Sequence, residues 1–403
     1  MTKTICILGR QPALGRAELE SLFGADAIHP IADYAVLLDI EPPQVDFTRL
    51  GGTMKFCKLL TILETTAWKD IEKFLHDAVP QHAAMLPEGK LKLGLSTYGM
   101  NVPVDRINAT ALATKKAIKA SGRSVRVISN TETALSSAQV LYNGLTRELG
   151  WELIFIKDGT RTVVAQNIAE QDIDAYAARD QKRPKRDSKV GMLPPKLAQI
   201  LVNLAIGPID LQDPACGPGE NKGKTVLDPF CGTGVVLQEA ALMGYDGYGS
   251  DLEERMVEYS RVNMDWLGET FAHPPFTYWV EEGDATSFKW LRGFDFGASE
   301  IYLGRPFSAA PNRDQLEETV QTTNLIFKKF LQNIHEQTEP GFRMALAVPA
   351  WKTESGFKHL KSLDNLAELG YNRLSFVHAS GGDLIYHREG QIVGRELIVL
   401  IRK

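Results

Sequence analysis

Two aspartates and two glycines in one short stretch carry the clearest chemistry of this chain. Residues 225–254 read TVLDPFCGTGVVLQEAALMGYDGYGSDLEE, which predicts a strand, a glycine turn, a helix and a second strand. Gly232 and Gly234 would form a tight turn in which the backbone can approach a ligand. Asp251 would follow the second strand, where an acidic side chain can accept hydrogen bonds from both hydroxyls of a ribose.

The same stretch indicates which nucleotide would bind there. A dinucleotide-binding turn needs a third glycine three positions past the second, and Leu237 stands there. The run Gly223-Lys224-Thr225 does not complete a phosphate loop, because that motif needs a glycine five positions before Gly223 and Pro218 stands there. Asp228 precedes the turn, where it would repel a phosphate and attract the ammonium group of a methionine moiety. These features favour S-adenosylmethionine over an ordinary strand–turn–helix with chance glycines.

Length and composition bound the class of protein. The 403 residues exceed what one core usually serves, and 44% hydrophobic with 24% charged residues is typical of a soluble globular protein. No apolar run is long enough for a membrane span, and the N-terminus does not resemble a signal peptide. Four cysteines without Cys-x-x-Cys spacing indicate neither a metal site nor disulfides, and so favour the cytoplasm. The net charge of -5 does not indicate nucleic-acid binding by the chain as a whole, although a local basic patch could still bind phosphates.

The elements that must position these residues fall into several parts. We expect an N-terminal part at 1–60, a second α/β unit at 61–170, an exposed joint rich in proline and charge at 171–196, and a catalytic domain at 197–403. The first two parts are expected to contain the strands 3–8, 34–40, 91–96, 125–129, 152–157 and 161–166 and the helices 13–23, 68–79, 104–120 and 134–149.

The catalytic domain alternates strands and helices, which predicts a mostly parallel, doubly wound sheet. Its later strands are expected at 277–280, 294–299, 344–348, 374–378 and 397–401. The last two of these would form an antiparallel pair at the sheet edge.

Several further motifs extend over nearly the whole chain. The motifs read ALSSAQV at 134–140, AQNI at 165–168, RDQKRPKRD at 179–187, GMLPPKLA at 191–198, DPFCGTG at 228–234 and GQIVGRE at 390–396. On these motifs the chain resembles the THUMP-domain tRNA guanine-N2 methyltransferases, which install N2-methylguanosine at position ten of tRNA. Many amino-group methyltransferases share the glycine turn, whereas the joint together with the turn is much more specific.

The resemblance implies a ferredoxin-like part at 1–60, an RNA-binding THUMP domain at 61–170 and a class I methyltransferase domain after the linker. It implies S-adenosylmethionine as cofactor, tRNA as partner, and neither a metal nor a membrane. The cofactor-binding residues it implies are Asp228, Pro229, Phe230, Gly232, Gly234, Asp251, Leu252, Asp284 and Ala285. The run Lys182, Arg183, Lys185 and Arg186 is expected to bind tRNA phosphates; without the family match it would equally suit a solvated linker.

One motif departs from the family pattern. The family carries Asp/Asn-Pro-Pro-aromatic after the fourth strand, and this chain has Glu300-Ile301-Tyr302-Leu303, followed by Gly304-Arg305-Pro306-Phe307. We expect the Glu300 carboxylate to accept a hydrogen bond from the guanine amine, and Tyr302 or Phe307 to stack on the base. Two alternatives stay open: a methyltransferase with another amine target, and a tRNA-binding protein that holds the cofactor but is inactive. The sequence does not distinguish mono- from dimethylation or reveal a helper subunit.

Overall fold

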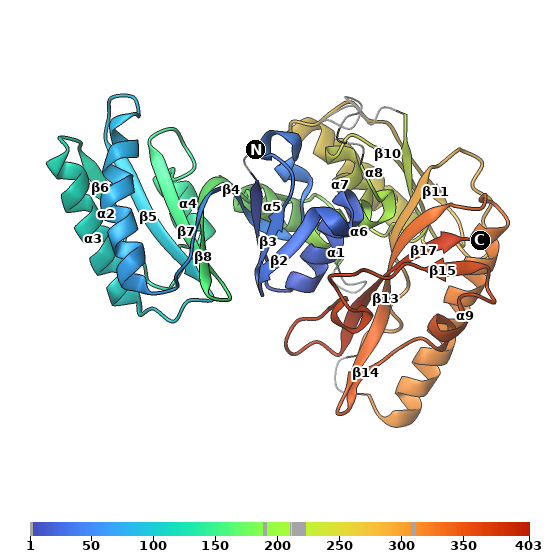
Figure 1. Ribbon diagram of the computed structural model, residues 1–403. Helices are drawn as coiled ribbons and strands as arrows, with labels where there is room; N and C mark the ends of the chain where they lie inside the picture. The colour runs from blue at the N-terminus through green and yellow to red at the C-terminus, as the bar shows by residue number, and fades with distance from the viewer. Residues whose placement is uncertain (1–2, 188–191, 210, 212–222, 308–310) are drawn as a thin grey trace. The chain divides into compact units, whose positions relative to one another are not determined.

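The computed structural model describes residues 3–187, 192–209, 211, 223–307 and 311–403 (Figure 1). The chain forms two compact units that interleave along the sequence. The first contains 1–12, 26–48 and 53–173, and the second contains 13–25, 49–52 and 174–403. Each unit is built around one sheet.

The first unit has an eight-stranded sheet in the order β2-β3-β1-β4-β8-β7-β5-β6. Its strands are β1 (Thr4–Leu8), β2 (Ile28–Ala32), β3 (Ala35–Leu38), β4 (Thr53–Leu63), β5 (Leu91–Tyr98), β6 (Val125–Val127), β7 (Gly150–Asp158) and β8 (Arg161–Glu170). The pairs β5–β6 and β5–β7 are parallel, and the other neighbours are antiparallel. The expected border at residue 60 falls inside β4, so 1–60 and 61–170 share one sheet.

Helices α2 (Trp68–Ala84) and α3 (Val104–Ala120) pack on one face of the part of this sheet formed by β5, β6, β7 and β8 (Figure 1). Both are amphipathic, and the buried stripe of α2 (Ile71, Leu75, Val79) packs with Leu91, Leu93 and Leu95 of β5. The expected helix 134–149 is wrong in length, because α4 comprises only Ser137–Asn143. Gly144 ends it with a left-handed φ of 62°, a conformation that continues no helix.

The second unit contains the sheet β11-β10-β9-β12-β13-β17-β15, with β14 and β16 paired to β13 and β17. Its strands are β9 (Thr225–Asp228), β10 (Asp246–Asp251), β11 (Tyr278–Glu282), β12 (Phe296–Glu300), β13 (Arg343–Thr353), β14 (Gly356–Lys358), β15 (Tyr371–Arg373), β16 (Ile385–Tyr386) and β17 (Val393–Arg402). The five strands β11, β10, β9, β12 and β13 run parallel to one another. Strand β17 is antiparallel to both of its neighbours, β13 and β15. A doubly wound sheet with an antiparallel edge is therefore confirmed.

Helices cover both faces of this second sheet. The helices are α5 (Ile173–Gln181), α6 (Pro195–Ile206), α7 (Val235–Leu242), α8 (Glu254–Thr270) and α9 (Arg313–His335). One core joins α6 and α7 to β9, β12 and β13, and another places α9 against Met344, Leu346 and Val348. The strand expected at 374–378 is wrong: the backbone N–H groups of Val377 and His378 donate to the Glu20 carboxylate instead of extending a ladder.

Helix α1 (Pro12–Phe23) contributes to this second unit although it lies near the start of the chain. Leu14 and Ala17 belong to the core around α6. The buried Glu18 carboxylate accepts hydrogen bonds from the backbone N–H groups of Gly51 and Gly52 at 2.9 and 2.8 Å, and from Asn203 Nδ2 at 2.8 Å. Burial raises the pKa of Glu18 to about 7 although these donors favour the charged form.

Candidate active site

The glycine turn follows β9 and opens α7, as the sequence predicts. Gly232 and Gly234 have φ of +51° and +80°, which side-chain-bearing residues rarely adopt. A Cβ on Gly234 would lie 3.0 Å from Ser260 Oγ, whereas one on Gly232 would meet open space. The turn is held by the Cys231 N–H, which donates to Ser250 O at 2.9 Å. The space above Gly232 is therefore open to a ligand, while its N–H and carbonyl bind Asp251 and Ser260.

Asp228 ends β9 beneath the turn and is 2% exposed. Its Oδ1 accepts hydrogen bonds from Ser299 Oγ at 2.6 Å and from the Phe230 N–H at 3.3 Å. Burial raises the pKa of Asp228 to about 7, and the hydrogen bond from Ser299 opposes that rise. A cation placed beside this carboxylate would restore its charge.

Asp251 ends β10, which neighbours β9 in the sheet. Its Oδ2 accepts a hydrogen bond from the Gly232 N–H at 2.9 Å, and its Oδ1 accepts one from the Glu253 N–H at 3.0 Å. Burial raises the pKa of Asp251, and these backbone donors oppose it. Leu252 is 67% exposed beside it and offers an apolar surface.

Asp284 and Ala285 lie in the turn after β11, the next strand outward. Asp284 is exposed, and its Oδ1 accepts a hydrogen bond from the Thr286 N–H at 2.9 Å. Ala285 is buried, and its carbonyl accepts a hydrogen bond from Asn333 Nδ2 at 3.0 Å. The exposed Asp284 carboxylate thus stands on a turn that α9 fixes from below.

These positions fit S-adenosylmethionine. Acidic side chains follow three neighbouring parallel strands, the exposed Leu252 offers a face for an adenine, and Gly232 leaves room for backbone contact. Pro229 and Phe230 complete the turn, with the Phe230 ring held edge-on against Phe330 at 5.1 Å. Ligands of open α/β sheets bind in the crevice at such strand ends.

Glu300 ends β12, on the other side of β9 from Asp251. Its side chain is 15% exposed, and Tyr302, two residues on, is 41% exposed. Gly304 has φ +90°, and a Cβ there would lie 2.5 Å from Thr319 Cγ2 of α9. Phe307 packs against the α9 core, with the Arg305 guanidinium 5.7 Å from its ring centre. Tyr302 is therefore more accessible to a base than Phe307.

The sequence reasoning missed the partner of Glu300. Arg395 of β17 donates from Nε to Glu300 Oε1 in an ion pair whose side chains are 8% and 15% exposed. Burial raises the pKa of Glu300, and Arg395 opposes it by charge and by this hydrogen bond. Arg395 belongs to the GQIVGRE motif, which was the one sign in the sequence that this residue matters. Its distance from Glu300 along the chain gave no reason to expect that the two side chains form a pair.

The basic run of the joint divides into exposed and buried members. Lys182 and Arg186 are exposed and Lys185 is half-buried, whereas Arg183 is 3% exposed. Arg183 Nη2 faces Met192 Sδ at 3.4 Å, and burial lowers the pKa of its guanidinium. The expected phosphate contact of Arg183 is thus corrected, because its charged group lies inside the unit.

The joint lies beside the glycine turn. Asn263 of α8 accepts from the Lys185 N–H at 3.0 Å and donates to the carbonyls of Lys185 and Thr233, both at 2.9 Å. Asp187 forms an ion pair with Arg255 at 2.8 Å. A base bound near the turn would therefore lie near the exposed cations of the joint.

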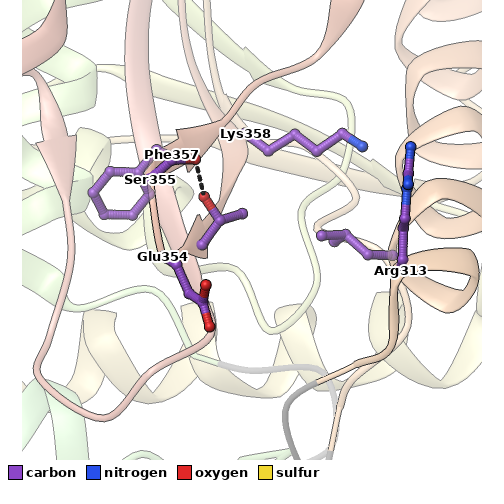
Figure 2. A pocket seen from close by; sticks show the side chains of 7 residues that line it. Arg313, Glu354, Ser355, Phe357 and Lys358 are labelled. Carbon is purple, nitrogen blue, oxygen red and sulfur yellow. Dashed lines mark hydrogen bonds between the residues drawn. The ribbon is translucent and has the colours of Figure 1, made fainter.

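A separate hollow of about 660 Å³ lies between the start of α9 and the β13–β14 hairpin. It is lined by Arg313, Leu316, Thr353, Glu354, Ser355, Phe357 and Lys358. Figure 2 shows Arg313 on α9 facing the hairpin across this hollow. The predicted site residues that the structure describes do not line it.

Residues 183–270 match the family described as the RMKL-like methyltransferase domain. The chain is 30% identical over 172 residues to the tRNA (guanine(10)-N2)-dimethyltransferase of Methanothermobacter thermautotrophicus, which is 43% of this chain and 42% of that protein. It is 30% identical over 161 residues to the protein of the same name from Pyrococcus abyssi, 39% of each. The chain thus spans about two fifths of the length of these relatives.

A solved structure of a "possible methylase" from Clostridium difficile 630 aligns with TM-score 0.50 at 12% identity, over 100% of this chain and 98% of that one. This likeness confirms the fold. The family model and the relatives thus show similarity to methyltransferases over part of the chain, and a methyltransferase domain agrees with S-adenosylmethionine as the cofactor. Over the described ranges, each helix is too short or too polar to cross a bilayer. Those ranges also contain no group of three or more His, Cys, Asp or Glu placed to hold a metal ion.

Proposed function

Because this chain carries an RMKL-like methyltransferase domain and is similar to tRNA (guanine(10)-N2)-dimethyltransferases, we propose that it methylates the exocyclic N2 amine of a guanosine in tRNA, at position ten. One observation carries the proposal. Four acidic side chains, Asp284, Asp251, Asp228 and Glu300, follow or end four neighbouring parallel strands. The first three suit a nucleoside with a cationic side chain, and the fourth suits an amine.

The residues around the glycine turn bind and orient the cofactor. S-adenosylmethionine supplies an electrophilic methyl group on a sulfonium. Asp251 accepts hydrogen bonds from the ribose hydroxyls, and Asp284 accepts one from the adenine amine. The adenine ring packs on Leu252 and Ala285. Asp228 attracts the ammonium of the methionine moiety, and the backbone of Pro229, Phe230, Gly232 and Gly234 lines the remaining wall.

Glu300 and Tyr302 present the substrate amine. The exocyclic amine of guanine is a poor nucleophile, because its lone pair is shared with the ring. An acceptor at Glu300 orients the amine hydrogens, so that the lone pair faces the methyl group. Methyl transfer would form the N–C bond while the S–C bond of the sulfonium breaks to leave a neutral thioether, and the Glu300 carboxylate can take up the proton that the amine would release. Tyr302 stacks on the flipped base, and the half-buried Phe307 supports the loop by packing against the α9 core.

The rest of the chain would hold the tRNA. Lys182, Lys185 and Arg186 contact phosphates beside the target base. Residues 61–170 act as a THUMP domain that recognises the folded shape of the RNA. A tRNA substrate would suit a cytoplasmic protein, and the free thiols of Cys57 and Cys231 would suit a reducing compartment.

Mass spectrometry of nucleosides tests the proposal. Transfer RNA incubated with the protein and isotope-labelled S-adenosylmethionine should contain labelled N2-methylguanosine or N2,N2-dimethylguanosine, and sequencing should place it at position ten. Glu300→Gln should lose most of this label while cofactor binding by calorimetry is unchanged. Label in another amine would support the alternative of a different target. Normal binding of cofactor and tRNA without any label would support the inactive binding protein instead.

A further inference from the structure

Glu300 and Arg395 meet across one strand of the sheet. Glu300 pairs with Ala347 of β13, and Arg395 pairs with Pro349 of the same strand from its other side. The Arg395 side chain reaches over β13 to Glu300 Oε1, and both side chains are largely buried, at 8% and 15% exposure. Burying an ion pair costs free energy, because both charges lose their hydration. A buried ion pair at the substrate-facing end of the strand therefore suggests a functional reason for keeping it.

Few other charged groups face this carboxylate. Asp228 of β9 is the acidic neighbour, and Glu300 in turn contributes to raising the pKa of Asp228. The facing part of β13, from Ala347 to Ala350, has no titratable side chain, and β16 places Tyr386 opposite Arg395. Among the described groups acting on Glu300, Arg395 is therefore the one cation that opposes the effect of burial on its pKa.

We propose that Arg395 is a positioning residue that keeps Glu300 ionised and leaves its second oxygen for the substrate, so that this pair selects guanine over adenine. The proposal rests on the function proposed above, in which Glu300 accepts a hydrogen bond from the amine. Arg395 donates to Oε1, and within the described residues Oε2 accepts no hydrogen bond, in a side chain that is 15% exposed.

The selectivity follows from hydrogen-bond chemistry. An ionised carboxylate offers only acceptors. The edge of guanine that carries the N2 amine presents two donors, the amine and the adjacent ring N1–H, and both suit a carboxylate. Adenine presents its amine next to an unprotonated ring nitrogen, an acceptor that a carboxylate repels. A neutral glutamic acid could donate to that nitrogen, so loss of Arg395 would weaken the discrimination as well as the rate.

The test compares Arg395→Met with Arg395→Lys in the full-length chain. For Arg395→Met, the acidic limb of the methyl-transfer rate against pH should move upward by about 1–3 pH units, because an opposite charge lowers a carboxyl pKa by that range. Its activity should therefore fall below the native activity on the acidic side and recover toward it at pH 9. Arg395→Lys should keep the native limb. If Arg395→Met only destabilised the fold, activity would fall by the same factor at pH 7 and pH 9. That result would overturn the proposal.

Two further measurements complete the test. Arg373→Met removes a neighbouring cation that pairs with Glu396 at 2.9 Å, and it should leave the acidic limb in place. Infrared difference titration of the carboxyl band that disappears in Glu300→Gln should report a higher pKa in Arg395→Met than in the native protein. An unchanged titration overturns the proposal whether or not methyl transfer occurs. A shifted titration in a protein that methylates no tRNA would instead refute the proposed function and leave the effect of Arg395 on Glu300 standing.

Discussion

At the scale of single residues, the acidic side chains of the site differ in how deeply they are buried, and so in their pKa values. Asp228 is 2% exposed, and burial raises its pKa to about 7, while Asp284 is exposed on its turn. A cationic ligand beside Asp228 needs the ionised form of this carboxyl. Cofactor binding should therefore depend on pH through Asp228.

We expect the affinity for S-adenosylmethionine to fall by about tenfold from pH 8 to pH 6. The sign follows from the raised pKa of about 7 for Asp228: above it the free protein already carries the charge, and below it binding must first expel a proton. Calorimetry at three pH values measures this slope. In Asp228→Asn the affinity should be lower and nearly independent of pH, and a slope equal to that of the native protein would contradict the assignment.

Asp251→Ala should weaken cofactor binding by about 1.5–3 kcal/mol, the range for hydrogen bonds to a charged group. The variant removes the acceptor for the ribose hydroxyls and also frees the Gly232 N–H that it holds at 2.9 Å. Calorimetry at pH 8 measures the loss. Glu253→Ala, which changes an exposed neighbour, is the matched control and should bind normally. Equal affinities for both variants would place the ribose elsewhere.

Residue types were predicted from the sequence more completely than residue pairs. Counting from Asp295 places Glu300 at the end of a strand, and the structure has it there. Its pairing with Arg395 spans 95 residues and depends on the register of β13 with β17, which no local pattern encodes. The burial of Arg183 has the same cause, because the sequence shows charge but not the side on which the joint meets the domain.

At the scale of elements, the joint should contribute to RNA affinity through its exposed cations. Replacing Lys182, Lys185 and Arg186 by Gln should weaken tRNA binding and reduce the slope of log affinity against log salt by up to about 3, roughly one for each lost phosphate contact. Gel shifts at several salt concentrations measure this. Replacing Lys328, Lys329 and Lys361, which are exposed on and after α9, removes the same charge and should leave the slope unchanged. Identical slopes would make the joint a linker only.

Element boundaries depended on contacts that the sequence does not display. Helices with long amphipathic repeats, such as α3 (Val104–Ala120), lie where the periodicity predicts. The strand expected at 374–378 had the right composition, but Glu20, more than 350 residues earlier, binds its backbone donors. Strand β4 was missed because its mixed composition obscures the alternation.

At the scale of the whole molecule, the two units interleave along the sequence. We therefore expect that a truncated protein that begins at residue 174 does not form a stable second unit. A fragment of residues 174–403 lacks both acceptors of the buried Asn203 amide, Glu18 Oε1 and the Arg49 carbonyl, and lacks the apolar contacts of Leu14 and Ala17. Each unsatisfied buried polar group costs about 1–3 kcal/mol. The fragment should melt at a lower temperature than the full chain or be insoluble.

Adding a synthetic peptide of residues 10–25 in trans should raise the melting temperature of this fragment. The same peptide with Leu14 and Glu18 changed to Asp and Ala is the control and should have no effect. A fragment as stable as the second unit of the intact protein, with no response to the peptide, would contradict this view of α1.

The place of α1 in the chain also sets an order of events during synthesis. Glu18 and Asn203 are 185 residues apart, and a ribosome adds about 5–20 residues per second. The helix therefore emerges on the order of 10–40 s before the residues it must contact. During that interval its apolar face stays without its native cover, so a newly made chain has a defined window in which a chaperone would find a binding site near its start.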